Sequence, residues 1–296
     1  MTLLADEVFM DPAGLNEDYD ARATVGVEGF AREMARYRSQ SEKMKQAYGL
    51  HFDITYCQES GQALDIFGPK VNGKGPLLPG FIFIHGGYWR ALSKEDSAMM
   101  AGTLAEKGIA TVVIDYPLAP AVGIGDIVHA VRSAVAFIWR RGHEFGLDPD
   151  RISLGGSSAG GHLLATLLAP GWHAAFGVPT DVVKFAFPIS GLFELAPLMK
   201  TRVQEWLALS DASVADYSPM RHIPAPGCPI TIAWAEGDPP GFKRQSEAFA
   251  SLYKAAGAET DLLEVPHCNH FDVLMEWADP TSLLSRTLIS GIFRNL

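Results

Sequence analysis

The chain has 296 residues, of which 48% are hydrophobic, so it is long enough to bury a large core. Its formal net charge of −10 argues against nucleic-acid and anionic-membrane partners, because phosphate binding requires a basic surface. The three cysteines lack metal-type spacing, and their odd number disfavours a disulfide framework. The first residues lack the basic start of a signal peptide, and no apolar run reaches transmembrane length. We therefore expect a cytoplasmic protein.

The N-terminal part of the chain changes character twice. Residues 1–27 are acidic and contain glycine and proline, which predicts an irregular arm lying on the body of the protein. Residues 28–48 place apolar side chains at spacings of three, four or seven, which predicts an amphipathic helix. HFDITY and ALDIFG then read as two strands.

From Phe81 onward, strands and helices alternate. The predicted strands are FIFI, IATVVIDY, RISLGG, VKFAFPIS, PITIAWAE and TDLLEV. This alternation predicts an α/β fold with a mostly parallel sheet and helices on both faces, and the nearly continuous apolar strands fit such burial. Residues 191–227 interrupt the alternation with helix-like pieces and prolines, which predicts a small inserted helical cap. We expect residues 1–296 to form a single domain.

The segment RISLGGSSAGG holds the pattern G-x-S-x-G between a predicted strand and a predicted helix. This context exposes a nucleophilic serine above a sheet, beside a helix N-terminus that favours negative charge. The register centres the pattern on Ser158, whereas Ser157 would be centred only if Gly155 and Ala159 were the flanking residues. A glycine-rich turn that serves only tight packing is the non-catalytic interpretation.

A serine nucleophile needs an adjacent base, and with this motif the chain order is serine, acid, histidine. The last predicted strand leads into HCNHFDVL, where His267 and His270 are the candidate bases. We favour His270 because Phe271 and the apolar residues after it would anchor it. The acid should follow the preceding strand, where Asp238 lies in the turn AEGDPPG and Glu236 is the alternative. Without a second cluster of ligands, a metal site at these histidines is not expected.

Several motifs together resemble the α/β-hydrolases. The resemblance is narrower to the arylformamidase (kynurenine formamidase) group, near the hormone-sensitive-lipase-like esterases. It rests on HGGYWRALSKED (residues 85–96), DYPLAP (115–120), GGSSAGGHLLA (155–165), GFKRQS (241–246) and HFD (270–272).

The resemblance implies a catalytic triad of Ser158, Asp238 and His270. It also implies an oxyanion hole made by the backbone N–H groups of Gly86, Gly87 and Ala159. Members of the group hydrolyse N-formylkynurenine to kynurenine and formate, and some cleave short activated esters. The implied partner is thus a small aromatic amide or ester, with no metal and no organic cofactor.

Four aromatic side chains are candidates for contact with that substrate. Tyr88 and Trp89 directly follow the two glycines of HGGYW, and Phe193 and Trp206 lie in the expected cap. Packing in the core or at the rim of the pocket is the alternative for each of them.

Three other functions compete with the formamidase hypothesis: a carboxylesterase for small acyl or aryl esters, a lyase, and a non-catalytic hydrolase-fold protein that binds a small molecule. The last usually lacks a triad member, whereas all three are present here. The sequence leaves a monomer and a homodimer open.

Overall fold

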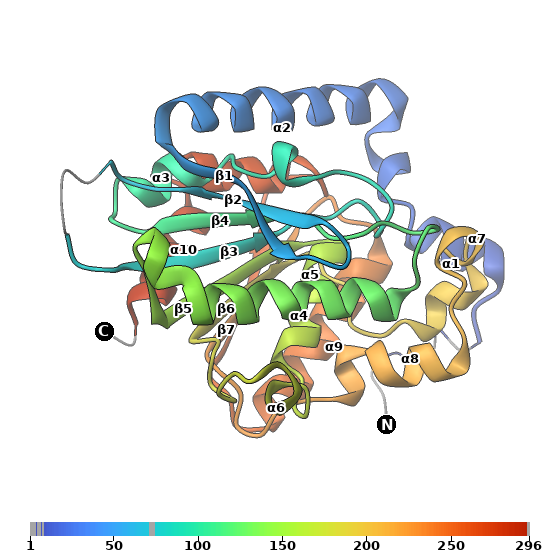
Figure 1. Cartoon of the computed structure of the whole chain (residues 1–296). Helices are drawn as coiled ribbons and strands as arrows, with labels where there is room; N and C mark the ends of the chain where they lie inside the picture. Colours follow the sequence, from blue (N-terminus) through green and yellow to red (C-terminus); the bar gives the residue numbers. More distant parts are fainter. Residues whose placement is uncertain (1–3, 5–6, 8, 71–74, 295–296) are drawn as a thin grey trace.

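The computed structural model describes residue 4, residue 7 and residues 9–294, apart from 71–74. Within them, eight strands form one sheet in the order β1-β2-β4-β3-β5-β6-β7-β8 (Figure 1). The strands are β1 (Gly49–Cys57), β2 (Gln62–Phe67), β3 (Leu78–Ile84), β4 (Ala110–Ile114), β5 (Leu147–Ser157), β6 (Phe185–Ile189), β7 (Ile230–Ala235) and β8 (Thr260–Val265). β1 and β4 pair antiparallel with β2, and every other pairing is parallel, so the predicted mostly parallel sheet is confirmed.

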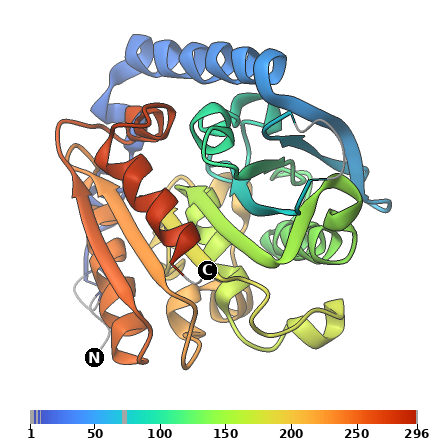
Figure 2. The same cartoon turned by 90° about the vertical axis from the view of Figure 1, so that its left-hand side faces the viewer.

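Helices cover both faces of the sheet (Figure 2). One face carries α2 (Gly26–Tyr48), α3 (Ala101–Ala105) and α10 (Leu283–Phe293), and the other carries α4 (Ile124–Arg141), α5 (Ala159–Leu168) and α9 (Pro240–Ala255). The reason is visible in α4, whose apolar stripe at three- and four-residue spacing is completely buried: Ile127, Val131, Ala134, Val135 and Ile138. The expected flanking of the sheet on both faces is therefore confirmed.

The predicted irregular arm contains two short helices, so its predicted conformation is wrong. They are α1 (Pro12–Asp18) and the 3₁₀ helix η2 (Ala21–Thr24). The Asp11 side chain accepts from the Gly14 N–H at 2.8 Å, and that of Asp20 accepts from the Ala23 N–H at 3.1 Å. These caps stabilise helices too short to show a periodic apolar pattern. Residues 1–3, 5–6 and 8 of the expected arm lie outside the described residues.

The segment between β6 and β7, which we call the insertion (residues 190–229), spans the expected cap. It contains η5 (Ala196–Lys200), α7 (Gln204–Leu207), α8 (Asp211–Tyr217) and η6 (Pro219–Arg221). The remaining short helices are η3 (Lys94–Asp96), η4 (Gly142–Phe145), α6 (His173–Phe176) and η7 (Asp272–Ala278). The helices of the described residues are too short or too polar to cross a membrane.

The loop after β8 is fixed to the core by Trp277 of η7. Its indole is fully buried and meets Phe81, Phe83 and Phe187 edge-on, with ring centroids 5.4–5.9 Å apart. Such aromatic contacts add to the free energy gained by burial of the rings. Because parallel strands end at one edge of a sheet, residues that follow β3, β5, β7 and β8 assemble beside this anchored loop.

Candidate active site

Ser158 forms the turn between β5 and α5, in an unusual backbone conformation. Its φ and ψ angles are 56° and −120°, a strained combination for a residue with a side chain. A Cβ on Gly156 would lie 2.3 Å from the Gly160 carbonyl oxygen, and one on Gly160 would lie 2.0 Å from that of Ile84. The two glycines therefore allow the sharp turn that presents Ser158 at the start of α5.

His270 and Asp238 are buried together on the loops after β8 and β7. The His270 Nδ1 lies 2.6 Å from the Asp238 Oδ1, and the two residues are 4% and 5% exposed. The other carboxylate oxygen accepts from the Ser190 hydroxyl at 2.5 Å and from the Ala235 N–H at 2.8 Å. These bonds fix the carboxylate, and Asp238 in turn fixes the imidazole with its Nδ1 as donor and its Nε2 as acceptor.

The alternative base and acid lie apart from this pair. The side chain of His267 is 94% exposed, and its Nδ1 lies 3.7 Å from the half-exposed Glu236 carboxylate. That carboxylate also accepts from the His267 backbone N–H at 2.7 Å, so both residues belong to an exposed turn. The geometry therefore favours His270 and Asp238.

The loop after β3 lies directly over Ser158. A Cβ on Gly86 would be 2.9 Å from the Ser157 carbonyl oxygen and 3.2 Å from the Ser158 Cβ. Gly87 has a φ of 95°, and a Cβ there would be 2.3 Å from the Ala91 carbonyl oxygen. Side chains are thus excluded at both positions, and the Gly86 backbone lies next to the serine turn.

A cavity of about 340 Å³ opens beside these residues, and Ser158 and His270 both line it. One wall comes from the N-terminal segment (residues 9–25) and α2: Asn16, Tyr19, Asp20, Ala21, Arg22, Phe30, Met34 and Tyr37. A second wall comes from the insertion: Thr201, Arg202, Val203, Glu205 and Trp206. The volume and the mixed aromatic and polar lining suit a small organic molecule.

Comparison with known proteins agrees with this architecture. The family model for BD-FAE matches residues 64–253, which is more than half of the chain. The protein belongs to the BD-FAE family. The chain is 32% identical to the kynurenine formamidase of Danio rerio, over 86% of each chain. It is also 32% identical to the carboxylic ester hydrolase LipN of Mycobacterium tuberculosis, over 83% of this chain and 72% of that protein.

Solved structures resemble this BD-FAE protein over most of its length. A Silicibacter crystal structure assigned to the thioesterases has a TM-score of 0.76 and 26% identity, covering 94% of this chain and 98% of that chain. A thermostable carboxylesterase from a metagenomic library has a TM-score of 0.69 and 20% identity, covering 96% and 99%. The expected α/β-hydrolase fold and the expected enzyme class, a hydrolase, are therefore confirmed.

The structure divides the four aromatic candidates of this BD-FAE protein into two pairs. Tyr88 and Trp206 line the cavity, and the Trp206 Nε1 donates to the Tyr88 carbonyl at 3.0 Å. Trp89 is fully buried outside the cavity lining, where its Nε1 donates to the His162 Nδ1 at 3.2 Å. Phe193 is likewise fully buried and stacks on Phe249, with centroids 4.2 Å apart. Trp89 and Phe193 therefore pack in the core, outside the lining of this cavity.

Sequence reasoning missed the wall formed by the N-terminal segment and α2. The periodicity of Phe30, Met34 and Tyr37 indicated one apolar helix face. These three side chains line the cavity, together with Phe271 from the loop after β8. The rings of Phe30 and Phe271 lie 5.3 Å apart. A pattern in one helix does not reveal what its apolar face contacts, so only the tertiary structure could assign these residues.

Two consecutive residues after β4, Asp115 and Tyr116, hold the loop that follows β3 (residues 85–96), which we call the glycine loop. The Tyr116 hydroxyl donates to the carbonyl oxygens of His85 and Gly86, at 2.9 and 3.0 Å, and its ring stacks on the His85 ring at 4.1 Å. Asp115 accepts from the Lys94 N–H at 2.7 Å. Burial lowers the pKa of His85 to about 4, which keeps its imidazole neutral beside the glycines.

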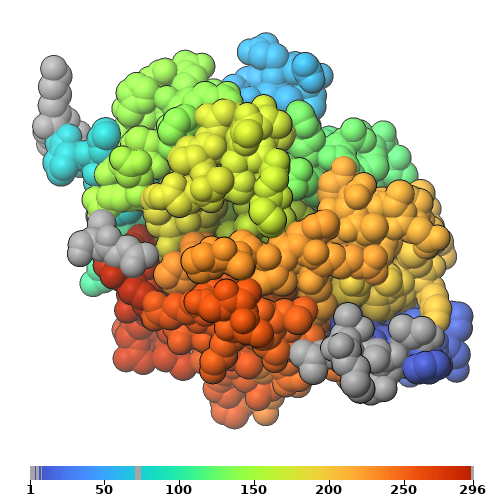
Figure 3. Space-filling view, turned by 90° about the horizontal axis from the view of Figure 1, so that it is seen from below, coloured from blue at the N-terminus to red at the C-terminus, as the bar shows by residue number. Residues whose placement is uncertain are grey.

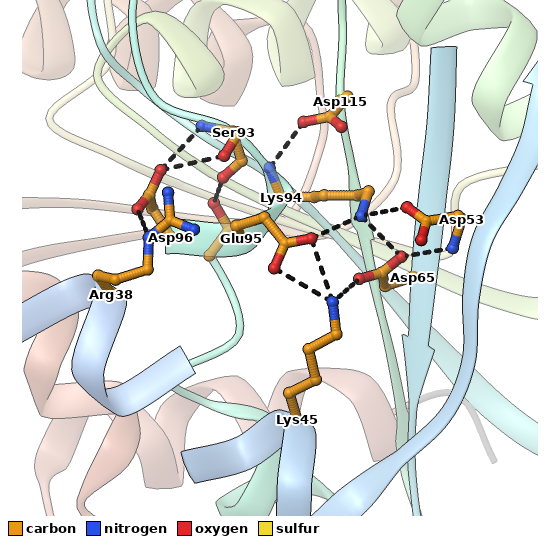
Figure 4. Close-up of polar contacts among 10 residues, drawn as sticks. Arg38, Lys45, Asp53, Asp65, Ser93, Lys94, Glu95, Asp96 and Asp115 are labelled. Atoms are coloured by element: carbon orange, nitrogen blue, oxygen red, sulfur yellow. Dashed lines mark hydrogen bonds and ion pairs between the residues drawn. The ribbon is translucent and has the colours of Figure 1, made fainter. Parts of the chain in front are cut away.

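The SKED motif ends this loop in a charge network whose centre, Lys94 with Asp65, is buried (Figure 4). The Lys94 ammonium is 5% exposed and contacts the carboxylates of Asp53, Asp65 and Glu95, at 2.8, 3.0 and 2.9 Å. Burial disfavours its charge, but these carboxylates outweigh burial and raise the pKa of Lys94. Lys45 of α2 joins the network through Glu95 and Asp65. The network therefore ties the end of the glycine loop to β1, β2 and α2.

Proposed function

We propose that the protein is a serine hydrolase that cleaves aryl formamides, such as N-formylkynurenine, to the free amine and formate. The observation that carries the proposal is the buried pair of His270 and Asp238, whose histidine lines the same aromatic cavity as Ser158. The formamide substrate is favoured by the kynurenine formamidases among the relatives. In this proposal Ser158 is the nucleophile, His270 the base and Asp238 the orienting acid.

The first half of the reaction forms a formyl-enzyme. The His270 Nε2 takes the hydroxyl proton of Ser158 while the Oγ forms a bond to the formyl carbon. The carbonyl π electrons move to oxygen, and the backbone N–H groups of Gly86, Gly87 and Ala159 stabilise that oxyanion. When the carbonyl reforms, the C–N bond breaks and the imidazolium donates its proton to the departing aryl amine.

The second half returns the enzyme to its starting state. His270 removes a proton from a water molecule, whose oxygen attacks the formyl carbon through the same oxyanion geometry. The bond to the Ser158 Oγ then breaks, the imidazolium returns the proton to Oγ, and formic acid leaves and ionises to formate in water. The negative charge of Asp238 stabilises the imidazolium in both halves.

The layout of the cavity supports a small acyl group and a large leaving group. Gly86 lies close against the serine turn, since a Cβ there would be 2.9 Å from the Ser157 carbonyl oxygen, and this proximity favours a small acyl group. The aromatic lining of Tyr19, Phe30 and Trp206 comes from the N-terminal segment, α2 and the insertion, and it suits an aryl amine.

A carboxylesterase is the second candidate, because esterases also occur among the relatives. The decisive experiment compares kcat/KM for N-formylkynurenine with that for short and long p-nitrophenyl esters. We expect efficient formamide cleavage, with ester turnover decreasing as the acyl group lengthens. Efficient ester turnover without formamide cleavage would replace the leading proposal with the esterase.

We further propose one catalytic domain with a cap formed by the insertion, acting in the cytoplasm. The three cysteines, Cys57, Cys228 and Cys268, are all free, which supports a reducing compartment. A homodimer stays a prediction. Size-exclusion chromatography with light scattering would measure the oligomeric state, and fractionation of cells that produce the protein would test its location.

A further inference from the structure

Gln245 of α9 connects the two walls of the cavity without lining it. It is completely buried, and its Oε1 accepts from the backbone N–H groups of Phe193 and Glu194, at 2.5 and 2.8 Å. Its Nε2 donates to the Glu194 carbonyl oxygen and to the Tyr19 hydroxyl, both at 2.9 Å. Every polar atom of this amide is thus used in joining the insertion to the N-terminal segment.

Neighbouring residues of α9 hold the same segment. The Arg244 guanidinium lies 2.6 Å from the carboxylates of both Glu7 and Asp18. A Cβ on Gly241 would lie 2.7 Å from the Asp18 carbonyl oxygen and from the Tyr19 ring. Seen from below, the N-terminal residues, in blue, lie beside the gold residues of the insertion (Figure 3). The N-terminal segment is therefore packed closely against α9.

Through Tyr19, the hydrogen bonds of Gln245 connect to Tyr88 in the loop after β3. Tyr19 lines the cavity, and its carbonyl oxygen accepts from the Tyr88 hydroxyl. On the other wall, the Arg202 N–H donates to Asn16 at 2.8 Å, again between the insertion and the N-terminal segment. α9 begins two residues after Asp238, so the same helix follows the proposed acid and fixes both walls.

We propose that Gln245 is a positioning residue for substrate selectivity. It sets the separation of the N-terminal segment and the insertion, and thereby the preference for a large aromatic group on the leaving side of the scissile bond. This inference rests on the proposed function only in placing the substrate in the cavity. A buried amide with four satisfied bonds permits one arrangement of the walls, since any shift leaves polar groups unpaired.

The test uses two acetate esters, 2-naphthyl acetate and vinyl acetate, which form the same acetyl-enzyme and differ only in the leaving group. Gln245→Met removes all four hydrogen bonds and keeps a similar length and volume. We expect KM for 2-naphthyl acetate to rise about tenfold, because the aromatic group loses its fitted walls. The kinetics with vinyl acetate should stay within about twofold, because its small leaving group does not reach them.

Gln204→Met is the matched control. Gln204 bonds two backbone groups of Leu209 within the insertion, at 2.8 and 2.9 Å, and makes no bond to the N-terminal segment. It should leave the ratio of kcat/KM for the two acetates unchanged. Circular dichroism verifies folding. If Gln245→Met does not fold, the same ratio of kcat/KM is measured in Gln245→Glu, which keeps the shape of the side chain and removes both donors.

Equal losses with both acetates, or an unchanged ratio, overturn the role of Gln245. Because both substrates are esters, this result is independent of whether N-formylkynurenine is cleaved. Failure of the formamidase proposal would appear in the wild-type protein, whereas failure of the positioning role would appear only in the variants.

Discussion

Asp238 accepts a 2.6 Å hydrogen bond from His270 with one oxygen and holds Ser190 and the Ala235 N–H with the other. Asp238→Asn keeps the size of the side chain and removes its charge. We expect kcat for the preferred substrate to fall about 10⁴-fold, because the amide favours the wrong imidazole tautomer and leaves the imidazolium unsupported. Steady-state kinetics provide the measurement, and a loss below about tenfold would argue against Asp238 as the orienting acid.

Ser158→Ala should abolish both amide and ester hydrolysis, because the nucleophile is lost. The matched variant is Ser157→Ala, one position earlier at the end of β5, which should retain most of the activity. Intact mass measured after incubation with a fluorophosphonate adds a second readout: the wild-type protein and Ser157→Ala should be labelled, and Ser158→Ala should not. Labelling that follows Ser157 would move the nucleophile by one residue.

Tyr116→Phe tests the support of the glycine loop. The variant keeps the ring stacked on His85 and removes the hydroxyl that bonds the carbonyls of His85 and Gly86. We expect kcat to fall about tenfold with little change in KM, since in the proposed mechanism the loop's N–H groups act mainly on the transition state. The control is Tyr253→Phe in α9, a fully buried tyrosine outside the cavity lining. An unchanged kcat in Tyr116→Phe would show that the loop keeps its geometry without this hydroxyl.

Lys94→Met should destabilise the protein by about 3 kcal/mol, because it leaves the buried Asp65 carboxylate with fewer partners. Lys107→Met alters an exposed lysine that follows α3 and should stay within about 0.5 kcal/mol of the wild type. Chemical denaturation followed by fluorescence measures both. Equal stability of the two variants would mean that the network contributes nothing net to folding.

Acidification should destabilise the protein through its buried histidines. Burial lowers the pKa of His162 to about 4. The His162 Nδ1 accepts a hydrogen bond from the Trp89 Nε1–H, and protonation of Nδ1 would leave two N–H groups facing each other. Because the unfolded chain binds this proton more readily, stability is full above pH 6.5 and is lost as the pH falls toward 4. The expected slope is about 1.4 kcal/mol per pH unit for each such histidine.

Denaturation curves between pH 7 and 4.5 measure that slope. His162→Gln should reduce it, while His143→Gln, which alters an exposed histidine, should not. An identical slope in wild type and His162→Gln would assign the acid sensitivity to other groups.

Much of the architecture was predictable from local patterns. The apolar runs such as FIFI identified the buried strands, and the stripe beginning at Ile127 identified α4, because burial of a regular element imposes its period on the sequence. The serine turn was equally predictable, since Gly156 and Gly160 are required by contacts within a few residues or with the adjacent strand. The short capped helix α1 was missed because it holds too few turns to show a period.

The sequence by itself determined the order of strands and helices, the position of Ser158 between β5 and α5, and a short set of candidate partners. The tertiary structure decided which candidates meet: His270 with Asp238, while His267 stays in solvent. It also showed that Tyr19 and Phe30 line the cavity, whereas Trp89 and Phe193 are buried outside its lining. The physical reason is range: helix period and turn geometry depend on near neighbours, whereas a cavity wall depends on contacts such as Gln245 with Tyr19, 226 positions apart.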